Sequence, residues 1–355
     1  MSALQNRRFT LIKRPTGMAQ RTDFEYSTVL AGEPGPGEVL LRVLYLSLDP
    51  AMRGWMNESR SYIAPVGLGE VMRAMGLGRV VASNDPMLKP GNFATGLTGV
   101  QDYAVVAAKS LNKVDPQLAP LPRYLSALGG TGLTAYFGLL EVGQPKPGET
   151  VVVSGAAGAT GSMVGQIAKI QRCRTVGIAG GTAKCKYLTE ELGFDAAIDY
   201  KSEDVRAALG RHCPDGVNVF FDNVGGEILD IVLAQLARKA RVVLCGAISQ
   251  YNNLADVRGP KNYLSLVINS ARMEGFIVFN YAQRYGEGIQ ALAAWLAEGK
   301  IKTREDIVEG LENFPKSVPQ AVSRREFREA GYQGCGGVIR GQGVVRTRGT
   351  HWASW

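Results

Sequence analysis

Residues 151–165 have the sequence VVVSGAAGATGSMVG, and this segment constrains the fold more than any other part of the chain. An apolar, β-branched run enters a loop of small residues, and apolar residues then recur at helical spacing. A strand that passes into a helix through such a loop is typical of a dinucleotide-binding βα unit. Gly158 and Gly161 lie where the backbone would approach a pyrophosphate, and the N-terminus of the helix would attract the phosphate charge. The alternative is a tight strand–helix turn in which small residues only permit close packing.

The next strand indicates which dinucleotide would bind. Residues 174–179 (RTVGIA) are followed by GGTAK, so no carboxylate stands at the end of this strand. An NAD site usually has Asp or Glu there, which accepts a hydrogen bond from the ribose 2′-hydroxyl. Lys184 follows within one helical turn and suits a 2′-phosphate, which favours NADP(H) over NAD(H). A solvated surface lysine is the alternative for Lys184.

Length and composition set the broad class. The length of 355 residues predicts about two domains. No apolar run approaches the about 18–20 residues of a membrane span, and the N-terminus has no apolar signal region, so we expect a cytoplasmic protein. The five cysteines show no CxxC pairing, which argues against a disulfide framework or a zinc ribbon. The net charge is +8, but residues 318–355 contribute +4 of it through six arginines and two glutamates. No basic run with interleaved aromatic residues occurs in the rest of the chain, so we expect no nucleic-acid surface.

The strand and helix patterns divide the chain into two domains, one inserted into the other. Residues 1–128 have short strands between Gly/Pro turns, clearest at 38–46, 78–82 and 103–107, which is typical of a mostly antiparallel domain. In residues 129–299 apolar strands alternate with amphipathic helices, which predicts an α/β domain with a doubly wound parallel sheet. Residues 300–317 return to the first domain. The strands expected in the inserted domain are 150–154, 175–179, 196–199, 217–222, 240–246 and 272–278.

Five motifs together carry a family resemblance. They are LSLDPAMRG at 46–54, TGLTAY at 131–136, the Gly158/Gly161 loop, FDNVGG at 221–226 and CGAISQYN at 245–252. From residue 8 to about 317 the chain resembles the medium-chain dehydrogenase/reductase family, in the zinc-free branch with prostaglandin reductases, alkenal/one oxidoreductases and bacterial curcumin reductases. The resemblance implies a doubly wound Rossmann sheet inserted into a GroES-like catalytic domain. It also implies NADP(H) as cofactor, and we expect a homodimer.

The absence of zinc can be argued from the residues themselves. A catalytic zinc needs Cys or His ligands, usually three protein groups and one open position. Residues 1–172 contain neither Cys nor His, and the only histidines are His212 and His351. We therefore expect no metal, so hydroxyl groups or backbone amides must polarise any carbonyl.

Without a metal, the reaction that we expect is transfer of hydride to an electron-poor carbon. Hydride added to the β-carbon of an enone or enal builds enolate charge on the carbonyl oxygen, and a neutral donor placed there stabilises it. Tyr251 is the candidate catalytic residue, because its motif resembles the family segment that leaves the fifth strand and reaches the nicotinamide. The α-carbon can take its proton from water. The alternative for Tyr251 is a packing tyrosine whose hydroxyl only positions the cofactor.

The resemblance also implies a set of cofactor contacts. Lys184 and Tyr200 correspond to the 2′-phosphate and adenosine-ribose contacts, and Asn223 to a contact after the fourth strand. The full cofactor-binding set is Gly158, Ala159, Thr160, Gly161, Lys184, Tyr200, Asn223, Cys245, Gly246, Ala247, Ile248, Ser249, Tyr251, Phe276, Ile277 and Val278.

Three positions in the first domain need separate interpretation. Arg53 and Asp49 belong to a family motif and are interpreted first as a structural ion pair or turn anchor, and second as substrate contacts. Val100 stands where relatives often have Trp, which leaves the wall of the substrate pocket undefined.

The expected function is NADPH-dependent reduction of the carbon–carbon double bond of α,β-unsaturated ketones or aldehydes. A quinone oxidoreductase is the alternative within the enzyme class. A non-catalytic NADPH-binding protein is the alternative outside it.

The last 38 residues do not fit the family. Residues 318–355 are rich in Arg and Gly and lack apolar periodicity. Back-translation of residues 318–334 permits a frame, read one nucleotide later, that encodes FLKLFRGENFGKLVIKV, which has the apolar spacing, loop and strand of the family tail. We infer a frameshift near Ser317, and we expect the tail as written to lack the closing helix and strand.

Overall fold

The computed structural model describes residues 4–252, 257–322 and 343–346. The chain divides into two compact units, one of residues up to 126 together with those from 305 onward, and one of residues 127–304. The sequence predicts these boundaries between residues 128 and 129 and between residues 299 and 300. In the described part of the chain, no helix is both long and apolar enough to cross a membrane.

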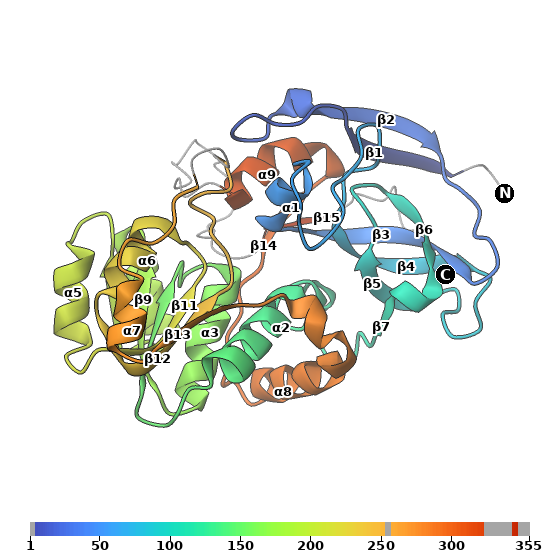
Figure 1. Cartoon of the computed structure of the whole chain (residues 1–355). Coiled ribbons are helices and arrows are strands. Elements are labelled where there is room, and N and C mark those ends of the chain that lie inside the picture. Colours follow the sequence, from blue (N-terminus) through green and yellow to red (C-terminus); the bar gives the residue numbers. More distant parts are fainter. Residues whose placement is uncertain (1–3, 253–256, 323–342, 347–355) are drawn as a thin grey trace. The chain divides into compact units, whose positions relative to one another are not determined.

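The first unit is built on antiparallel strands, as its Gly/Pro-punctuated sequence predicts. Its seven-stranded sheet has the order β14-β15-β3-β4-β5-β7, with β6 also paired to β3, and β1 and β2 form a separate hairpin (Figure 1). The strands are β1 (Gln5–Leu11), β2 (Phe24–Leu30), β3 (Glu38–Leu48), β4 (Met75–Ser83), β5 (Phe93–Leu97), β6 (Tyr103–Ala107), β7 (Asn112–Val114), β14 (Asp306–Glu309) and β15 (Gly343–Arg346). The helical segments are η1 (Arg21–Asp23), α1 (Ala51–Trp55), η2 (Ala108–Ser110), η3 (Leu121–Tyr124), η8 (Leu311–Asn313) and α9 (Phe314–Val322).

The core of the first unit joins its two ends in sequence. Phe9 and Phe24 of the N-terminal hairpin pack against Phe314 of α9, with ring centroids 5.4 and 5.2 Å from it. Val318, one turn further along α9, is 1% exposed in the same cluster. Burial of these aromatic side chains fixes α9 to the domain.

Two parts of the tail correct the sequence-based expectation. Helix α9 continues to Val322, and β15 pairs in parallel with β14 and antiparallel with β3. The prediction that residues 318–355 lack a closing helix and strand is therefore wrong for 318–322 and 343–346. The pairing satisfies backbone groups on both neighbouring strands, a gain that composition does not reveal. The rest of the tail lies outside the described residues.

The second unit is a six-stranded sheet with the order β10-β9-β8-β11-β12-β13, parallel throughout (Figure 1). Its strands are β8 (Thr150–Ser154), β9 (Arg174–Ala179), β10 (Ala196–Asp199), β11 (Val217–Asp222), β12 (Leu236–Leu244) and β13 (Arg272–Gly275). Its helical segments are α2 (Gly130–Phe137), η4 (Gly138–Gly143), α3 (Ala159–Ile170), α4 (Thr182–Lys186), η5 (Tyr187–Glu191), α5 (Val205–His212), α6 (Gly226–Leu233), α7 (Leu264–Ile268), η7 (Val278–Arg284) and α8 (Tyr285–Ala297). The predicted doubly wound sheet is confirmed.

Apolar residues on both faces of the strands explain this architecture. Val152 and Phe220 face a cluster that includes Val205 of α5 and Val232 of α6, and all four are buried. A Cβ added at Gly143 of η4 would lie 3.2 Å from Val219, which points from β11 to the other face. A parallel sheet covered on both sides has strands that are apolar throughout, as they are here.

Three strands differ from their predicted bounds, β9 by a single residue, since it begins at Arg174 rather than 175. β12 spans Leu236–Leu244 rather than 240–246, and its pairing with β11 shifts register between Val217 and Val219. β13 ends at Gly275 rather than 278, because Phe276 turns into the core, where its ring lies 6.3 Å from that of Phe221. The apolar run 276–278 is therefore partly loop.

Candidate functional site

The parallel sheet has one switch point, between β8 and β11. From β8 the chain proceeds outward to β9 and β10, whereas β11 leads the other way to β12 and β13. The loops after β8 and β11 therefore diverge to opposite faces, and ligands of such sheets bind in the crevice that this leaves at the carboxyl ends of the strands. The candidate site is built from the loops at this edge.

The loop after β8 turns sharply into α3. Gly155 has φ +58°, a conformation that favours glycine, and the Gly158 amide donates to its carbonyl over 2.9 Å. Gly158 is exposed and precedes the first turn of α3, which contains Ala159 and Thr160. The first amides of a helix have no partner within it, so this turn presents donors at the sheet edge.

The two predicted glycines have different environments. A Cβ at Gly161 would lie 2.5 Å from the Gly155 carbonyl oxygen and 2.8 Å from the Ala156 Cα, so the loop itself requires glycine there. At Gly158 the nearest atom to an added Cβ is the Gly155 oxygen at 3.1 Å. Close packing of the loop thus explains Gly161, while close approach of a ligand remains a prediction for both.

A buried hydrogen-bond network joins the two strands at the switch point. The Ser154 hydroxyl donates to Asp222 Oδ1 over 2.6 Å, and both residues are fully buried. The Val224 and Gly225 amides donate to the Asp222 carboxylate over 3.0 Å. The Asn223 amide group donates to the Ser154 carbonyl over 2.8 Å, which fixes the orientation of its side chain. The sequence motifs single out Asn223 as a site residue but not Ser154 or Asp222.

The loop after β12 folds back on the loop after β11. The Cys245 and Gly246 amides donate to the Asp222 carbonyl, over 2.9 and 3.1 Å, and the Ser249 hydroxyl donates to the Val224 carbonyl over 2.6 Å. In the same loop the Ile248 amide donates to the Asn223 carbonyl over 3.3 Å. Burial raises the pKa of the Cys245 thiol to about 12, so this side chain stays neutral. The residues predicted after the fourth and fifth strands therefore lie together.

Tyr251 ends this loop with its hydroxyl against the preceding turn. The Ala247 amide donates to the Tyr251 oxygen over 3.3 Å, and a Cβ at Gly246 would lie 2.8 Å from that oxygen. An oxygen that accepts a hydrogen bond keeps its own proton and becomes a better donor. The geometry is compatible with a donor to substrate and with a residue that positions the cofactor.

The ends of β9 and β10 form the opposite side of the site. No acidic residue follows β9, where Ala179 leads through Gly180 and Gly181 into α4 with Lys184. Tyr200 lies directly after β10, and a Cβ at Gly180 would be 2.8 Å from its phenol oxygen. The tyrosine ring therefore covers the turn after β9.

The predicted segment 276–278 is only partly at the surface. Phe276 packs inward, since a Cβ at Gly138 would lie 2.3 Å from the tip of its ring. Ile277 and Val278 are half-buried. The Phe276 ring thus packs against Gly138 and Phe221, and a cofactor contact by this segment would come from its other atoms.

In the first unit, Arg53 is a turn anchor. Its guanidinium donates to the carbonyls of Gly17 and Pro15 over 2.8 and 3.0 Å and to Asn57 Oδ1 over 2.6 Å. Burial lowers its pKa, with a nearby Asp23 acting against that shift. Val100 is fully buried in the core of the unit, so its side chain packs there.

Among the described residues, no three side chains of the types His, Cys, Asp and Glu lie close enough together to hold a metal ion. The sequence also places no Cys or His before residue 173.

Comparison with known proteins identifies the family. Residues 7–114 match the N-terminal domain of oxidoreductase, and residues 159–294 match a family described as zinc-binding dehydrogenase. The NADPH-dependent curcumin reductase of Escherichia coli is 41% identical over 328 residues, which is 91% of this chain and 95% of that protein. A 2-alkenal reductase (NADP(+)-dependent) of Nicotiana tabacum is 38% identical over 330 residues, 91% of this chain and 96% of that protein.

A solved structure agrees over nearly the whole chain. CurA from Vibrio vulnificus in complex with NADPH superposes with a TM-score of 0.88 at 40% sequence identity, covering 97% of this chain and 99% of that one. The chain belongs to the medium-chain dehydrogenase/reductase family of oxidoreductases, in the branch that contains curcumin reductases, alkenal reductases and prostaglandin reductases.

Proposed function

We propose that this protein is an NADPH-dependent, zinc-independent reductase of the carbon–carbon double bond of α,β-unsaturated ketones and aldehydes. The three loops at the carboxyl edge of the sheet hold the α3 N-terminus, Asn223 and Tyr251 on one hydrogen-bonded frame. Such a frame suits a dinucleotide whose pyrophosphate meets the helix and whose nicotinamide meets the loop after β12.

The residues at the far side of the site favour NADPH. Lys184 supplies a cation for the adenosine 2′-phosphate, and no carboxylate after β9 competes for a ribose hydroxyl. The related reductases from Escherichia coli and Nicotiana tabacum carry NADPH or NADP(+) in their names, and the related structure holds NADPH.

The expected reaction needs little acid–base chemistry from the protein. When bound, NADPH would supply the hydride that adds to the substrate β-carbon and would be oxidised to NADP⁺, and water would supply the proton for the α-carbon. Tyr251 donates a hydrogen bond to the carbonyl oxygen as enolate charge develops there, in place of a metal. In the alternative role, Tyr251 only orients the nicotinamide.

Initial rates of NADPH oxidation with enones, alkenals and quinones test this function. Turnover of enones and alkenals with a saturated carbonyl product supports the proposal. Faster turnover of quinones favours the quinone reductase alternative, and NADPH binding without turnover of any of them favours a binding protein.

Lys184→Ala tests the cofactor assignment, with Lys186→Ala as a charge-matched control on the same helix. A charge-assisted contact with phosphate contributes about 1.5–3 kcal/mol, so Lys184→Ala should weaken NADPH binding about ten- to a hundredfold and leave NADH nearly unchanged. Lys186→Ala should change neither. Equal losses for both cofactors in Lys184→Ala contradict the assignment.

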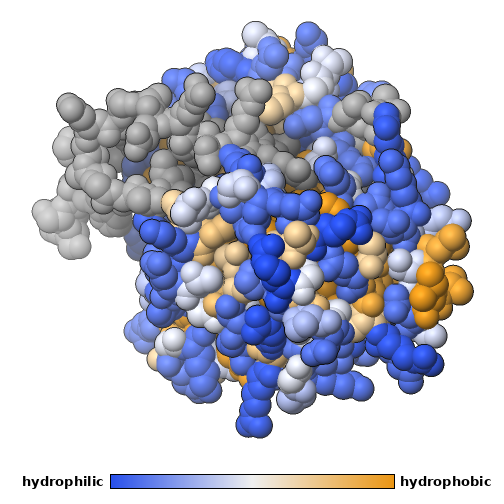
Figure 2. All heavy atoms as spheres, turned by 90° about the vertical axis from the view of Figure 1, so that its left-hand side faces the viewer, coloured by the Kyte–Doolittle hydropathy of each residue, from blue (hydrophilic) through white to orange (hydrophobic). Residues whose placement is uncertain are grey.

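We also propose a homodimer in the cytoplasm. β13 is an end strand of the sheet, and the adjacent α7 exposes apolar side chains, with Val267 and Ile268 76% and 77% exposed. Figure 2, which faces this side of the molecule, shows orange apolar surface at its right margin beside mostly hydrophilic atoms. Pairing of β13 with its copy would satisfy the strand edge and cover such a surface. Sedimentation should give a dimer that Ile268→Lys weakens, and a monomer at micromolar concentration would contradict this.

No disulfide joins the described cysteines, which suits the reducing compartment that we propose.

A further inference from the structure

Asp199 is the last residue of β10, beside Ala179 at the end of β9. It is 8% exposed. Its Oδ1 accepts the Gly181 amide over 2.7 Å and the Lys201 amide over 3.1 Å, and the Ser202 side chain donates to the same carboxylate. A single side chain thus binds the turns that follow both strands.

The two turns are those that present the expected adenosine contacts. Gly181 has φ +94° and caps α4, and its carbonyl accepts the Lys184 amide over 3.0 Å. The Lys201 amide lies next to Tyr200, whose ring covers Gly180. The Asp199 carboxylate therefore sets the spacing between the backbone that carries Lys184 and the backbone that carries Tyr200.

The electrostatics agree with this structural role. Burial opposes ionisation of Asp199, but the hydrogen bonds from Gly181, Lys201 and Ser202 outweigh it, so the pKa of the carboxyl lies below its ordinary value. Hydrogen bonds to an ionised acceptor are shorter and stronger than neutral ones, so the frame is stiffer than an ordinary turn.

We propose that Asp199 is a positioning residue for the subsite that takes the adenosine 2′-phosphate, and that it contributes to discrimination between NADPH and NADH without touching either. This inference rests on the proposed NADPH-dependent function. Removing the carboxylate charge should let the α4 turn and the Tyr200 turn drift apart, which loosens the phosphate contact while the pyrophosphate site at α3 stays intact.

The same strand offers a matched control at its other end. Asp195 directly precedes β10, accepts the Thr175 amide over 2.7 Å and binds the Lys169 ammonium over 2.8 Å. Burial opposes ionisation of Asp195 too, and the Lys169 and Thr175 hydrogen bonds lower its pKa. Both carboxylates tie β10 to β9, but Asp195 does so at the amino edge, away from the candidate site.

The test compares the binding of four probes by calorimetry: NADPH, NADH, 2′,5′-ADP and 5′-AMP. Asp199→Asn should weaken NADPH and 2′,5′-ADP about tenfold, the effect of one charge-assisted hydrogen bond, and change NADH and 5′-AMP less than about twofold. kcat at saturating NADPH should stay unchanged. Asp195→Asn should lower the melting temperature about as much as Asp199→Asn does. It should alter none of the four affinities.

Two further measurements test whether Asp199 acts through the phosphate subsite. Ser202→Ala removes one donor to the Asp199 carboxylate from an exposed position. It should weaken NADPH binding about two- to threefold, and this can be measured even where Asp199→Asn folds poorly. In a Lys184→Ala background, Asp199→Asn should weaken NADPH no further, because its effect passes through Lys184.

Equal weakening of NADPH and NADH by Asp199→Asn, or the same discrimination loss in Asp195→Asn, overturns the inference and leaves the proposed function standing. A wild-type protein that binds neither NADPH nor 2′,5′-ADP overturns the proposed function itself, and the inference with it.

Discussion

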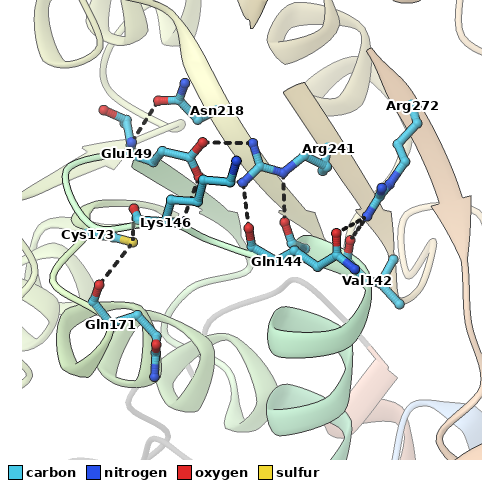
Figure 3. Close-up of polar contacts among 11 residues, drawn as sticks. Val142, Gln144, Lys146, Glu149, Gln171, Cys173, Asn218, Arg241 and Arg272 are labelled. Carbon is cyan, nitrogen blue, oxygen red and sulfur yellow. Dashed lines mark hydrogen bonds and ion pairs between the residues drawn. The ribbon is translucent and has the colours of Figure 1, made fainter. Parts of the chain in front are cut away.

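Arg241 on β12 provides the most direct test of how the second unit is held together. Its guanidinium donates to the carbonyls of Gly143 and Gln144, over 2.9 and 2.8 Å, and forms a two-pronged ion pair with Glu149 (Figure 3). These groups lie in the connection that leads from η4 into β8, so one side chain fastens that connection to a strand two positions away in the sheet. The network lies at the amino edge, opposite the candidate site.

The expected cost of Arg241→Met follows from burial. The side chains of Arg241 and Glu149 are 12% and 19% exposed. Breaking a buried ion pair costs about 3–5 kcal/mol, because the remaining charge is left without a partner. Residual exposure lets water reach Glu149, so we expect about 3 kcal/mol, out of the about 5–15 kcal/mol that stabilise a typical domain. With a urea dependence of about 2 kcal/mol per molar, the midpoint should fall by about 1.5 M.

Arg272→Met is the matched control on the neighbouring strand. Arg272 binds the same connection, through the Val142 carbonyl at 2.7 Å and Gln144 Oε1 at 3.2 Å, but its side chain is 46% exposed. Its loss should cost about 1 kcal/mol or less. Urea unfolding followed by circular dichroism, with NADPH affinity measured in parallel, compares the two variants. Equal losses in both would refute the argument from burial, and a loss of NADPH affinity in Arg241→Met would refute the separation of the network from the site.

The pH dependence gives an independent check. Burial opposes ionisation of Glu149, but hydrogen bonds from Arg241 and the Lys146 amide outweigh it and lower its pKa. A carboxyl with a lowered folded pKa stabilises the fold above its unfolded pKa of about 4.3, and this contribution is lost as pH falls through the folded value. The difference in stability between wild type and Arg241→Met should therefore shrink between pH 6 and pH 3. A difference that stays constant over that range contradicts the ion-pair explanation.

Three further outcomes are expected. Activity should survive prolonged chelation, with no stoichiometric zinc by elemental analysis, whereas activity lost to a chelator and restored by zinc would refute the metal-free mechanism. Tyr251→Phe should lower kcat on enones about 10²–10³-fold with little change in NADPH affinity, and unchanged kcat with weaker cofactor binding would assign Tyr251 to positioning alone. A chain that ends in FLKLFRGENFGKLVIKV from position 318 should have a higher urea midpoint than the chain as written, and a source gene that encodes the present frame unambiguously would reject the frameshift.

Periodicity alone predicts the parallel sheet because its strands are apolar on both faces. Strands 150–154, 196–199 and 217–222 have the predicted bounds, since each ends at a polar or small residue that starts a loop. β13 is shorter than predicted because Phe276 leaves the strand and packs against Phe221, while Ile277 and Val278 lie half-buried beyond the strand end. Periodicity cannot distinguish these two uses of an apolar residue.

The predicted site residues are mainly those that a ligand would touch, and the missed ones hold them in place. Ser154 and Asp222 are 68 positions apart and meet only because β8 and β11 are neighbours. Their signal in the sequence is slight: an Asp at a strand end followed by Asn-Val-Gly-Gly, which is the pattern of an Asx turn. Asp199 has a similar signal before Tyr200. An acidic residue at the end of a parallel strand is therefore worth testing as a binder of the neighbouring turn, and not only as a ribose contact.

The tail shows why composition is a poor guide to the last strand of a sheet. On one side of β3, β6 pairs with residues 38–42, and β15 pairs with residues 45–48. The position of β15 lies between β3 and β14, and both of these strands have backbone groups to satisfy. A short β-branched segment such as GVVR is therefore enough to complete the ladder. In a chain that ends in the alternative frame, we expect KLVIKV to take the same position. Either tail would therefore fill the same place in the sheet. The gain in stability expected from the alternative frame is limited to its longer strand and its apolar continuation of α9. It follows that the full loss of a strand, several kcal/mol, overestimates the difference in stability that we expect between the chain as written and one that ends in FLKLFRGENFGKLVIKV.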